Sequence, residues 1–208
     1  MQKLREKKAG KFNQSGFDES MSSDELYENR AGIFAEFGRI ICISVGYIAR
    51  NSENQKEFRQ KSFSGDDEQR ILLDFFDMVD SYFSKPHQKL CGHNISEFDV
   101  PYICRRAMVH GLRVPELFNL QGKKPREINH LDTLEMRKFG DRKNFISLDL
   151  LTRVLGLPTP KTDISGDQVA RVYYDEKDLP RIVSYCERDV QAVVRILMKF
   201  MRIDEKIE

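Results

Sequence analysis

The stretch "GRIICISVGYIAR", residues 38–50, is followed by "NSENQ" at 51–55 and "EFRQKSFSG" at 57–65. The first segment is apolar and β-branched, which is typical of a buried strand, and the last alternates apolar and polar residues as a neighbouring strand does. The polar linker between them is short, so the two strands are predicted to form a hairpin.

Beyond this hairpin the chain alternates between helical and extended patterns. Residues 64–83, "SGDDEQRILLDFFDMVDSYF", have acids at the front and apolar residues every three or four positions, which predicts an amphipathic helix. Further helices are predicted at 100–111, 147–156 and 179–201, and short strands at 88–94 and 128–133. This order predicts an α/β domain with a mixed sheet and helices packed on it.

The length of 208 residues suits one domain with a real core. Residues 1–30 are basic first and acidic later, with few apolar residues, and are predicted to be a flexible or partly helical lead-in. The domain itself is expected at 31–202, followed by a tail at 203–208. No apolar run is long enough for a membrane span and no leader pattern opens the chain, so we expect a cytoplasmic protein without membrane contact.

The overall charge is balanced. The 34 basic and 33 acidic side chains leave a net charge of +1, so binding to a polyanion has to come from local basic patches. This balance neither supports nor excludes a nucleic-acid partner. The four cysteines are scattered without a C-x-x-C pair, which favours four buried thiols over a zinc site.

Two acidic residues are candidates for chemistry. Asp99 lies in "CGHNISEFDVPY", residues 91–102, after a polar turn and before a proline-started helix. Asp189 follows Tyr185 by four positions, so the two side chains share a helix edge beside the apolar stripe, where a carboxylate needs a partner such as a divalent cation. Taken singly, Asp99 fits a helix N-cap and Asp189 fits an exposed helix aspartate, so each is weak evidence alone.

Together, "HNISEFD" at 93–99 and "YCERD" at 185–189 resemble the second and third motifs of the DnaQ-like 3′-5′ exonucleases, in their tyrosine (DEDDy) variant. The segments "AGIFAEFGRIICISVGY", "HLDTLEMRKFGDRKNFISLDLLTRVLGLP" and "KTDISGDQVARVYY" are similar to bacterial proteins related to the exonuclease domain of family-B DNA polymerases. This resemblance runs from about Ala31 to about Phe200.

The resemblance implies a ribonuclease-H-like fold in which four carboxylates hold two Mg²⁺ or Mn²⁺ ions for phosphodiester hydrolysis. Asp99 and Asp189 would be metal-binding catalytic acids, and Tyr185 would orient the attacking water. Phe98 would support the second motif by packing, and Asn94 by hydrogen bonding near the bound strand. The implied substrate is the 3′ end of a nucleic acid, with single-stranded DNA preferred. Oxygen-only ligands also suit such hard cations.

The first motif of that family, an Asp-x-Glu on a central apolar strand, has no counterpart in this sequence. The literal Asp66 to Glu68 opens the predicted helix at 64–83, where compensation of the helix dipole explains it better. The fold is therefore expected to lack its first central strand, and a two-metal site built from the remaining acids is incomplete. A fragment, a misplaced gene start and a degenerate relative retained for binding would each account for this, and the intact later motifs favour the first two.

Several functional consequences follow from the missing motif. The sequence predicts little nuclease activity for this chain despite its family, and the alternative is a non-catalytic nucleic-acid-binding module. A purely structural or oligomerising domain is a third interpretation. Unpaired strand edges predict self-association or recruitment of another strand.

Basic and aromatic residues alternate in two further segments. "KFGDRKNF" contains Arg142 and Lys143, candidate substrate-binding residues, and "QGKKPREINH" adds three more cations; the strip fits either a single-stranded backbone or a solvated loop. Asp132 and Asp149 are expected to serve turns and helix caps. His93 and His110 are expected to be hydrogen-bonded structural histidines.

Overall fold

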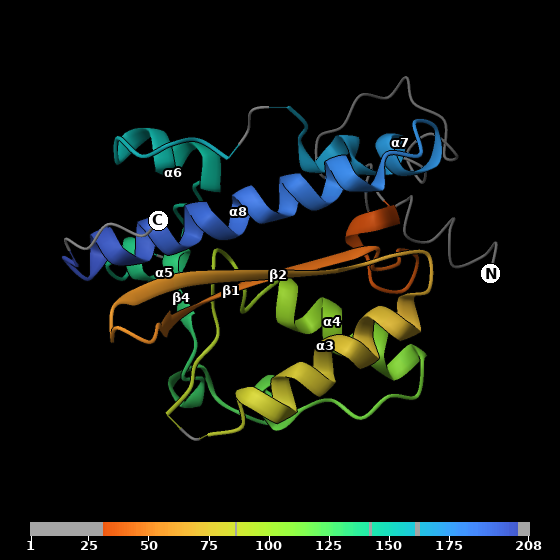
Figure 1. Cartoon of the computed structure of the whole chain (residues 1–208), viewed down its shortest axis with the longest axis horizontal. Coiled ribbons are helices and arrows are strands. Elements are labelled where there is room, and N and C mark those ends of the chain that lie inside the picture. Colours follow the sequence, from red (N-terminus) through yellow and green to blue (C-terminus); the bar gives the residue numbers. More distant parts are fainter. Residues whose placement is uncertain (1–30, 86, 142, 161–162, 204–208) are drawn as a thin grey trace.

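A computed structural model describes residues 31–85, 87–141, 143–160 and 163–203. The predicted lead-in at 1–30 and nearly all of the tail at 203–208 lie outside these residues, as does Arg142. The α/β class is confirmed: a small amount of sheet is flanked by helices, consistent with a ribonuclease-H-like architecture (Figure 1).

The predicted hairpin is present. Strand β1 (Cys42–Arg50) pairs antiparallel with β2 (Lys56–Ser64), with Cys42 opposite Ser64 and Arg50 opposite Lys56. A second, parallel pair joins β3 (Cys91–Gly92) to β4 (Leu131–Asp132). Both orientations of a mixed sheet therefore occur, but within the described residues the two pairs are not hydrogen-bonded to each other.

The main helices cover the two faces of the hairpin (Figure 1). Helices α3 (Glu68–Tyr82) and α4 (Asp99–Val109) lie on one side, and the long helix α8 (Leu179–Phe200) crosses the other. Two shorter helices, α6 (Leu148–Val154) and α7 (Val169–Tyr174), pack on α8 from outside. The helices predicted from periodicity are all present, with ends shifted by a few residues.

Short elements complete the chain. Helix α5 (Thr133–Lys138) follows β4 directly. The described residues also contain the 3₁₀ turns η1 (Ala31–Ile33), η2 (Glu116–Phe118), η3 (Pro125–Glu127) and η4 (Gly166–Gln168). Helices α5 and α7 were not predicted, because six residues are too few to show a helical period.

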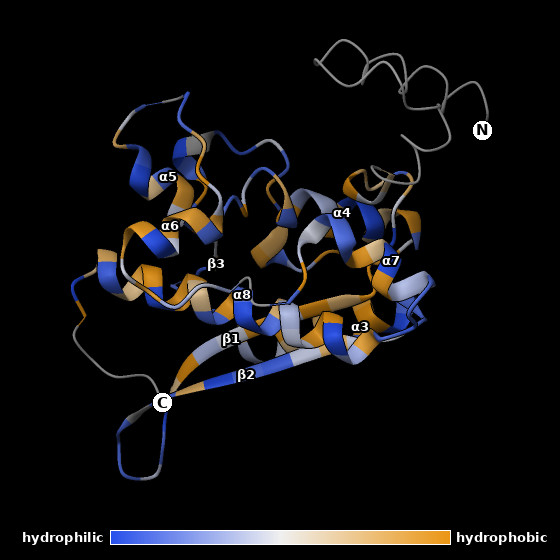
Figure 2. Ribbon diagram, turned by 90° about the horizontal axis from the view of Figure 1, so that it is seen from above, coloured by the Kyte–Doolittle hydropathy of each residue, from blue (hydrophilic) through white to orange (hydrophobic). Residues whose placement is uncertain are grey.

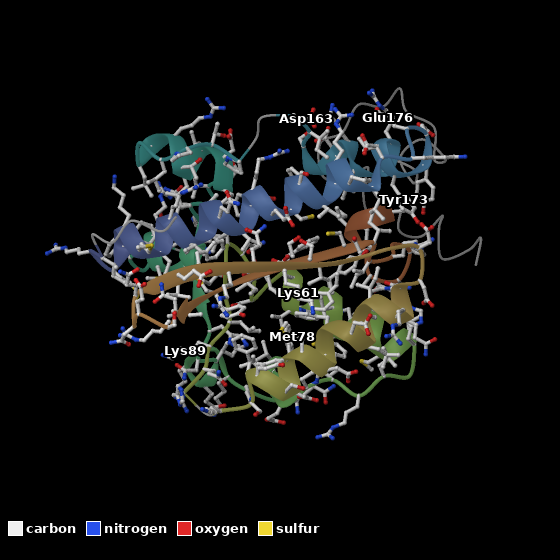
Figure 3. All side chains as sticks on the ribbon, viewed as in Figure 1. Lys61, Met78, Lys89, Asp163, Tyr173 and Glu176 are labelled. Atoms are coloured by element: carbon white, nitrogen blue, oxygen red, sulfur yellow. The ribbon has the colours of Figure 1, made fainter. Side chains whose placement is uncertain are left out.

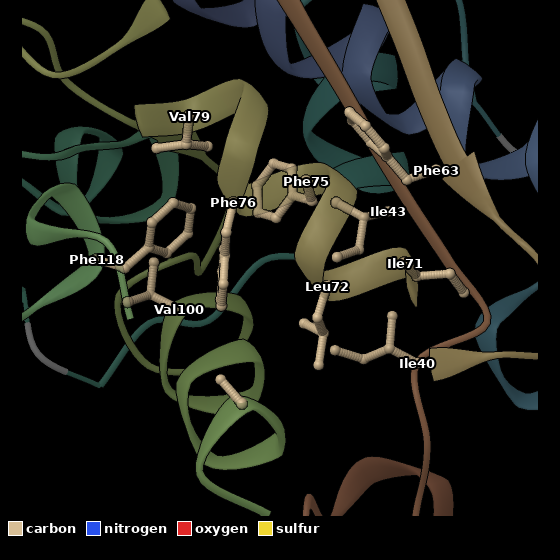
Figure 4. Packing of buried hydrophobic residues seen from close by; sticks show 11 residues of the cluster. Ile40, Ile43, Phe63, Ile71, Leu72, Phe75, Phe76, Val79, Val100 and Phe118 are labelled. Atoms are coloured by element: carbon tan, nitrogen blue, oxygen red, sulfur yellow. The ribbon is translucent and has the colours of Figure 1, made fainter. Parts of the chain in front are cut away.

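The largest hydrophobic core lies between the hairpin and α3 (Figure 4). Phe75 is at its centre: its ring lies 5.6 Å from that of Phe63 on β2 and 5.5 Å from that of Phe118, both edge to face. Such pairs add to the free energy gained by burying the rings. The acids and alternating apolar residues of 64–83 thus produce a helix that buries one face in this core.

Alternate residues of β1 point to α8 on its other face. Gly46 has no side chain, and a Cβ there would lie 2.5 Å from the Phe58 ring and 3.0 Å from Val190 Cγ1. The helix and strand can therefore approach closely at this point. One turn earlier in α8, Glu187 accepts a hydrogen bond from Ser62 Oγ at 2.8 Å, which fixes the helix to β2.

Polar residues cover much of β2 and the region around α7 (Figure 2). Figure 2 shows hydrophilic colour along much of β2, whose outer positions face solvent. Around α7, Arg181 forms ion pairs with Asp163 and Glu176, two of the residues labelled in Figure 3. In the described part of the chain, no helix has both the length and the apolar character needed to cross a bilayer.

Candidate active site

Asp99 lies a few residues after β3, one strand of the parallel pair. Strand β3 ends at Gly92, the loop 93–98 turns the chain, and Asp99 is the first residue of α4. Phe98, not Asp99, occupies the N-cap position, and no side-chain capping bond is made there. The interpretation of Asp99 as the N-cap residue of α4 is therefore wrong.

The carboxyl of Asp99 lies in an unusual electrostatic environment. Asp99 is an exposed residue by its solvent-accessible surface, yet protein atoms are dense around its carboxyl group. This dense surrounding raises the pKa of Asp99 to about 6; the hydrogen bond from its own backbone N–H opposes the rise, and the negative charges of Asp132 and, last, Asp189 add smaller contributions to it. The structure therefore brings Asp189, ninety positions away in the chain, within electrostatic reach of Asp99.

Asp189 and Tyr185 share one edge of α8, as their spacing predicts. Their side chains are hydrogen-bonded, and burial together with the charge of Asp189 holds the pKa of the Tyr185 phenol far above its ordinary value. The phenol is therefore protonated near neutral pH and is the donor in this bond. Gly166 lies against it, because a Cβ built there would be 3.8 Å from the Tyr185 hydroxyl.

A third carboxylate, Asp132, organises the loop that precedes Asp99. It is only 5% exposed, and it accepts backbone N–H groups from Asn94 at 2.9 Å, Ser96 at 3.2 Å and Leu134 at 3.0 Å. Its bond to Leu134 is an N-cap of α5, so the predicted capping role of Asp132 is confirmed. The two bonds to the loop could not be read from the sequence, because they join residues nearly forty positions apart.

Both ring nitrogens of His93 are engaged in this region. Nδ1 lies 2.9 Å from Thr133 Oγ1, and Nε2 lies 2.9 Å from the carbonyl oxygen of Ile146. The Ile146 carbonyl oxygen can only accept, and the Thr133 hydroxyl also donates to the Gly92 carbonyl oxygen at 3.2 Å. The structural role predicted for His93 is confirmed, and the bond ties the 93–98 loop to the segment that contains Phe145.

Asn94 and Phe98 occupy different positions in the loop. Asn94 has φ of 64°, a left-handed conformation that Asn tolerates better than most residues, and its N–H is held by Asp132. Phe98 is 42% exposed, and its ring is tilted on that of Tyr102 with centroids 5.6 Å apart. Phe98 is thus a partly exposed aromatic at the entrance to α4, packed on one neighbour and not buried in the core.

The literal Asp-x-Glu does not join these acids. Asp66 accepts a hydrogen bond from Tyr173 at 2.5 Å. Glu68 is buried, and it accepts from the Ile40 backbone N–H at 2.7 Å, from Arg106 and from His110. Burial opposes ionisation of Glu68, but these three donors more than offset it, so its pKa is lowered. Glu68 is a structural anion, a role beyond the helix-dipole effect predicted for it, and the structural role of His110 is confirmed.

The predicted basic strip divides into two parts. Lys143 is exposed and follows α5 closely, whereas Lys123 lies near Glu116, with Nζ 3.7 Å from Oε1. Asp149 pairs with Arg153 in α6 and accepts from the Thr159 hydroxyl, in line with a structural role. Among the residues that the structure describes, no group of three or more His, Cys, Asp or Glu side chains is arranged to hold a metal ion.

Comparison with known proteins gives one clear relationship. No curated protein matches the chain. A family described as predicted 3′-5′ exonuclease related to the exonuclease domain of PolB matches residues 33–208, which includes Asp99, Tyr185 and Asp189. The match covers most of the sequence, and the chain belongs to this family.

Proposed function

We propose that this domain acts on the 3′ ends of nucleic acids as a metal-dependent exonuclease of the tyrosine (DEDDy) type, with single-stranded DNA as its preferred substrate. The observation that carries the proposal is the electrostatic coupling of Asp99 to Asp189, together with the hydrogen bond between Asp189 and Tyr185. Membership of the exonuclease family supports the same reaction class.

The donor set fits a hard cation. Asp99 and Asp189 supply carboxylate oxygens, the ligands that Mg²⁺ and Mn²⁺ prefer, and mutual repulsion between the two anions is relieved when a cation lies between them. Such an ion, when bound, supplies Lewis-acid activation of water and stabilises the leaving oxygen. Asp132 is not available as a third ligand in this arrangement, because its oxygens accept three backbone N–H groups.

The protein's own groups have distinct roles in this proposal. Asp99 and Asp189 bind the ion, and Tyr185, protonated at neutral pH, orients the attacking water through the lone pairs of its hydroxyl oxygen. Phe98 contacts the substrate through its exposed ring, and Asn94 hydrogen-bonds near the bound strand. Lys143, with Arg142, binds phosphates.

A second candidate is a non-catalytic nucleic-acid-binding module that uses the same surface. The engagement of Asp132 with backbone N–H groups favours it, because the two carboxylates of Asp99 and Asp189 make a weaker ion site than the four that the family resemblance implies. The two candidates share the substrate and differ in whether it is shortened.

Shortening of a 3′-labelled single-stranded oligonucleotide in Mn²⁺ tests the proposal. Activity that is lost in Asp189→Asn and Asp99→Asn, reduced in Tyr185→Phe and unchanged in Asp74→Asn supports the exonuclease. Asp74 is a suitable control because it pairs with Arg70 on the surface of α3. Salt-sensitive binding without shortening supports the binding module instead, and absence of both contradicts the two candidates.

We further propose that a second copy of the chain pairs with the free edge of β1. Within the described residues β1 is hydrogen-bonded to β2 alone, although it is nine residues long. An edge of that length presents a row of backbone N–H and C=O groups that another strand can bond.

A further inference from the structure

Two exposed aromatic rings flank a loop beside the candidate site. Phe139 is 96% exposed and Phe145 is 66% exposed, although burial of a Phe ring is favourable. Phe139 also has φ of 46°, a left-handed conformation that is unusual for a bulky residue, followed by Gly140 with φ of 89°. The fold therefore holds an apolar ring in water at some conformational cost.

The backbone that carries these rings is fixed at both ends. Arg137 Nη1 donates to Asn144 Oδ1 at 3.3 Å, which joins the end of α5 to the far side of the loop. The Lys143 N–H donates to Asp141 Oδ1 at 3.0 Å. Ile146, next to Phe145, is buried and accepts a hydrogen bond from His93. The rings thus project from defined positions.

The loop is close to the segment that delivers Asp99. The pKa of the Lys138 ammonium is raised, first by its hydrogen bond to Glu135 and further by negative charges that include Glu97 and Asp132. Lys138 immediately precedes Phe139, and Glu97 lies two residues before Asp99. The hydrogen bond from His93 to the Ile146 carbonyl oxygen, at 2.9 Å, places the backbone next to Phe145 against the 93–98 loop.

The charges around the rings indicate which partner fits them. Arg137 at the end of α5 and Lys143 in the loop bring two cations next to the two aromatic side chains, whereas Lys138 is paired with Glu135. Exposed bases stack on aromatic rings while phosphates bind neighbouring cations, so rings with basic neighbours match a single-stranded nucleic acid. A duplex keeps its bases stacked inside and offers no such surface.

We propose that Phe139 and Phe145 form a base-stacking platform that binds single-stranded nucleic acid next to Asp99. This inference rests on the proposed function for its substrate class, and it adds the way in which unpaired bases are held. Lys143 supplies a phosphate contact, and the ring of Phe139, almost fully open to solvent, makes the larger stacking contribution.

Fluorescence anisotropy of a labelled oligothymidylate, with EDTA present to prevent cleavage, tests the platform. Phe139→Ala is expected to weaken binding about tenfold and Phe145→Ala by less. Val154→Ala is the matched control, because it removes an apolar side chain that is 69% exposed on a different element, α6. Duplex DNA of the same length is expected to bind more weakly to the unaltered protein.

An abasic oligonucleotide separates stacking from charge. The Phe139→Ala effect is expected to vanish on it, whereas the Lys143→Ala effect persists and lowers the salt dependence. Unchanged affinity of Phe139→Ala for the normal strand, or equal losses on normal and abasic strands, overturns the platform. A change in self-association without a change in DNA binding also overturns it, in favour of a protein interface.

Cleavage in Mn²⁺ is measured separately on the same variants. Stacking that depends on Phe139 without any cleavage supports the platform and contradicts the exonuclease. Cleavage and binding that are both unchanged in Phe139→Ala support the exonuclease and contradict the platform.

Discussion

The carboxylate of Asp132 accepts the backbone N–H of Asn94 at 2.9 Å, so the residue that caps α5 also holds the loop leading to Asp99. A second bond, from the Ser96 N–H at 3.2 Å, fixes the other end of the same turn. The position of Asp99 therefore depends on a carboxylate whose oxygens accept backbone N–H groups.

Replacing Asp132 by Asn is expected to lower stability and loosen this turn. An amide has one acceptor oxygen where the carboxylate has two, and the lost charge-assisted bonds are worth about 2 kcal/mol. Urea unfolding measures the loss, and the Mn²⁺-dependent rise in melting temperature reports the state of the Asp99 site. The stability in urea and the Mn²⁺-dependent rise in melting temperature are both expected to fall in Asp132→Asn, whereas Asp74→Asn is expected to change neither. A variant with normal stability and a normal Mn²⁺ response would show that the loop holds its shape unaided.

The buried anion Glu68 makes a separate prediction, because it accepts bonds from Arg106, His110 and the Ile40 N–H. Glu68→Gln is expected to cost about 3–5 kcal/mol, since it leaves the guanidinium of Arg106 buried without its counter-ion. The pKa of Glu68 is lowered in the folded state, so its stabilisation is present above its ordinary value of 4.5 and lost as pH falls through the folded value. The difference in unfolding free energy between the unaltered protein and Glu68→Gln is therefore expected to become smaller as pH falls.

The control for Glu68 is Glu57→Gln. Glu57 pairs with Arg59 at 3.0 Å on the exposed face of β2, and a surface pair of this kind contributes under about 1 kcal/mol. Urea unfolding of the three proteins over a range of pH measures both effects. An equal cost for the two substitutions would mean that Glu68 is not a structural anchor.

The contribution of Asp99 to stability has the opposite pH dependence to that of Glu68. The pKa of Asp99 is raised to about 6 in the folded protein, so between its ordinary value of 3.8 and about 6 the folded state binds more protons than the unfolded state. Stability from this group therefore declines as pH rises across that window. Asp99→Asn is expected to flatten the decline, and Mn²⁺ is expected to stabilise the unaltered protein more at pH 7 than at pH 5. A decline identical in both proteins would contradict the assigned environment of Asp99.

Much of this organisation was predictable because it depends on local patterns. The apolar stripe of α8 and the four-residue spacing of Tyr185 and Asp189 placed their side chains on one edge, and the alternation in 57–65 predicted β2. The assignment of Asp99 and Asp189 to one candidate site came only from the family resemblance, since no local pattern joins residues ninety positions apart.

What the sequence could not reveal depends on tertiary contacts. Glu68 has the appearance of an ordinary acid at a helix start, and only the approach of α4 makes it the partner of Arg106. The reach of Asp132 back to Asn94 likewise exists only once β3 and β4 are paired. The basic and aromatic strip was visible in the sequence, but the 96% exposure of Phe139 required coordinates.

The free edge of β1 predicts association that depends on concentration. Ile48 lies on this strand and is 47% exposed, so a charge there opposes pairing with a second copy. Size-exclusion chromatography with light scattering is expected to show dimers or larger species of the unaltered protein that weaken on dilution. Ile48→Lys is expected to shift the protein to monomer. Val154→Lys, which also replaces an exposed apolar residue but lies on α6, is expected to leave association unchanged. A protein that stays monomeric at high concentration contradicts pairing at the β1 edge, and equal effects of the two lysines would indicate general repulsion between charged chains.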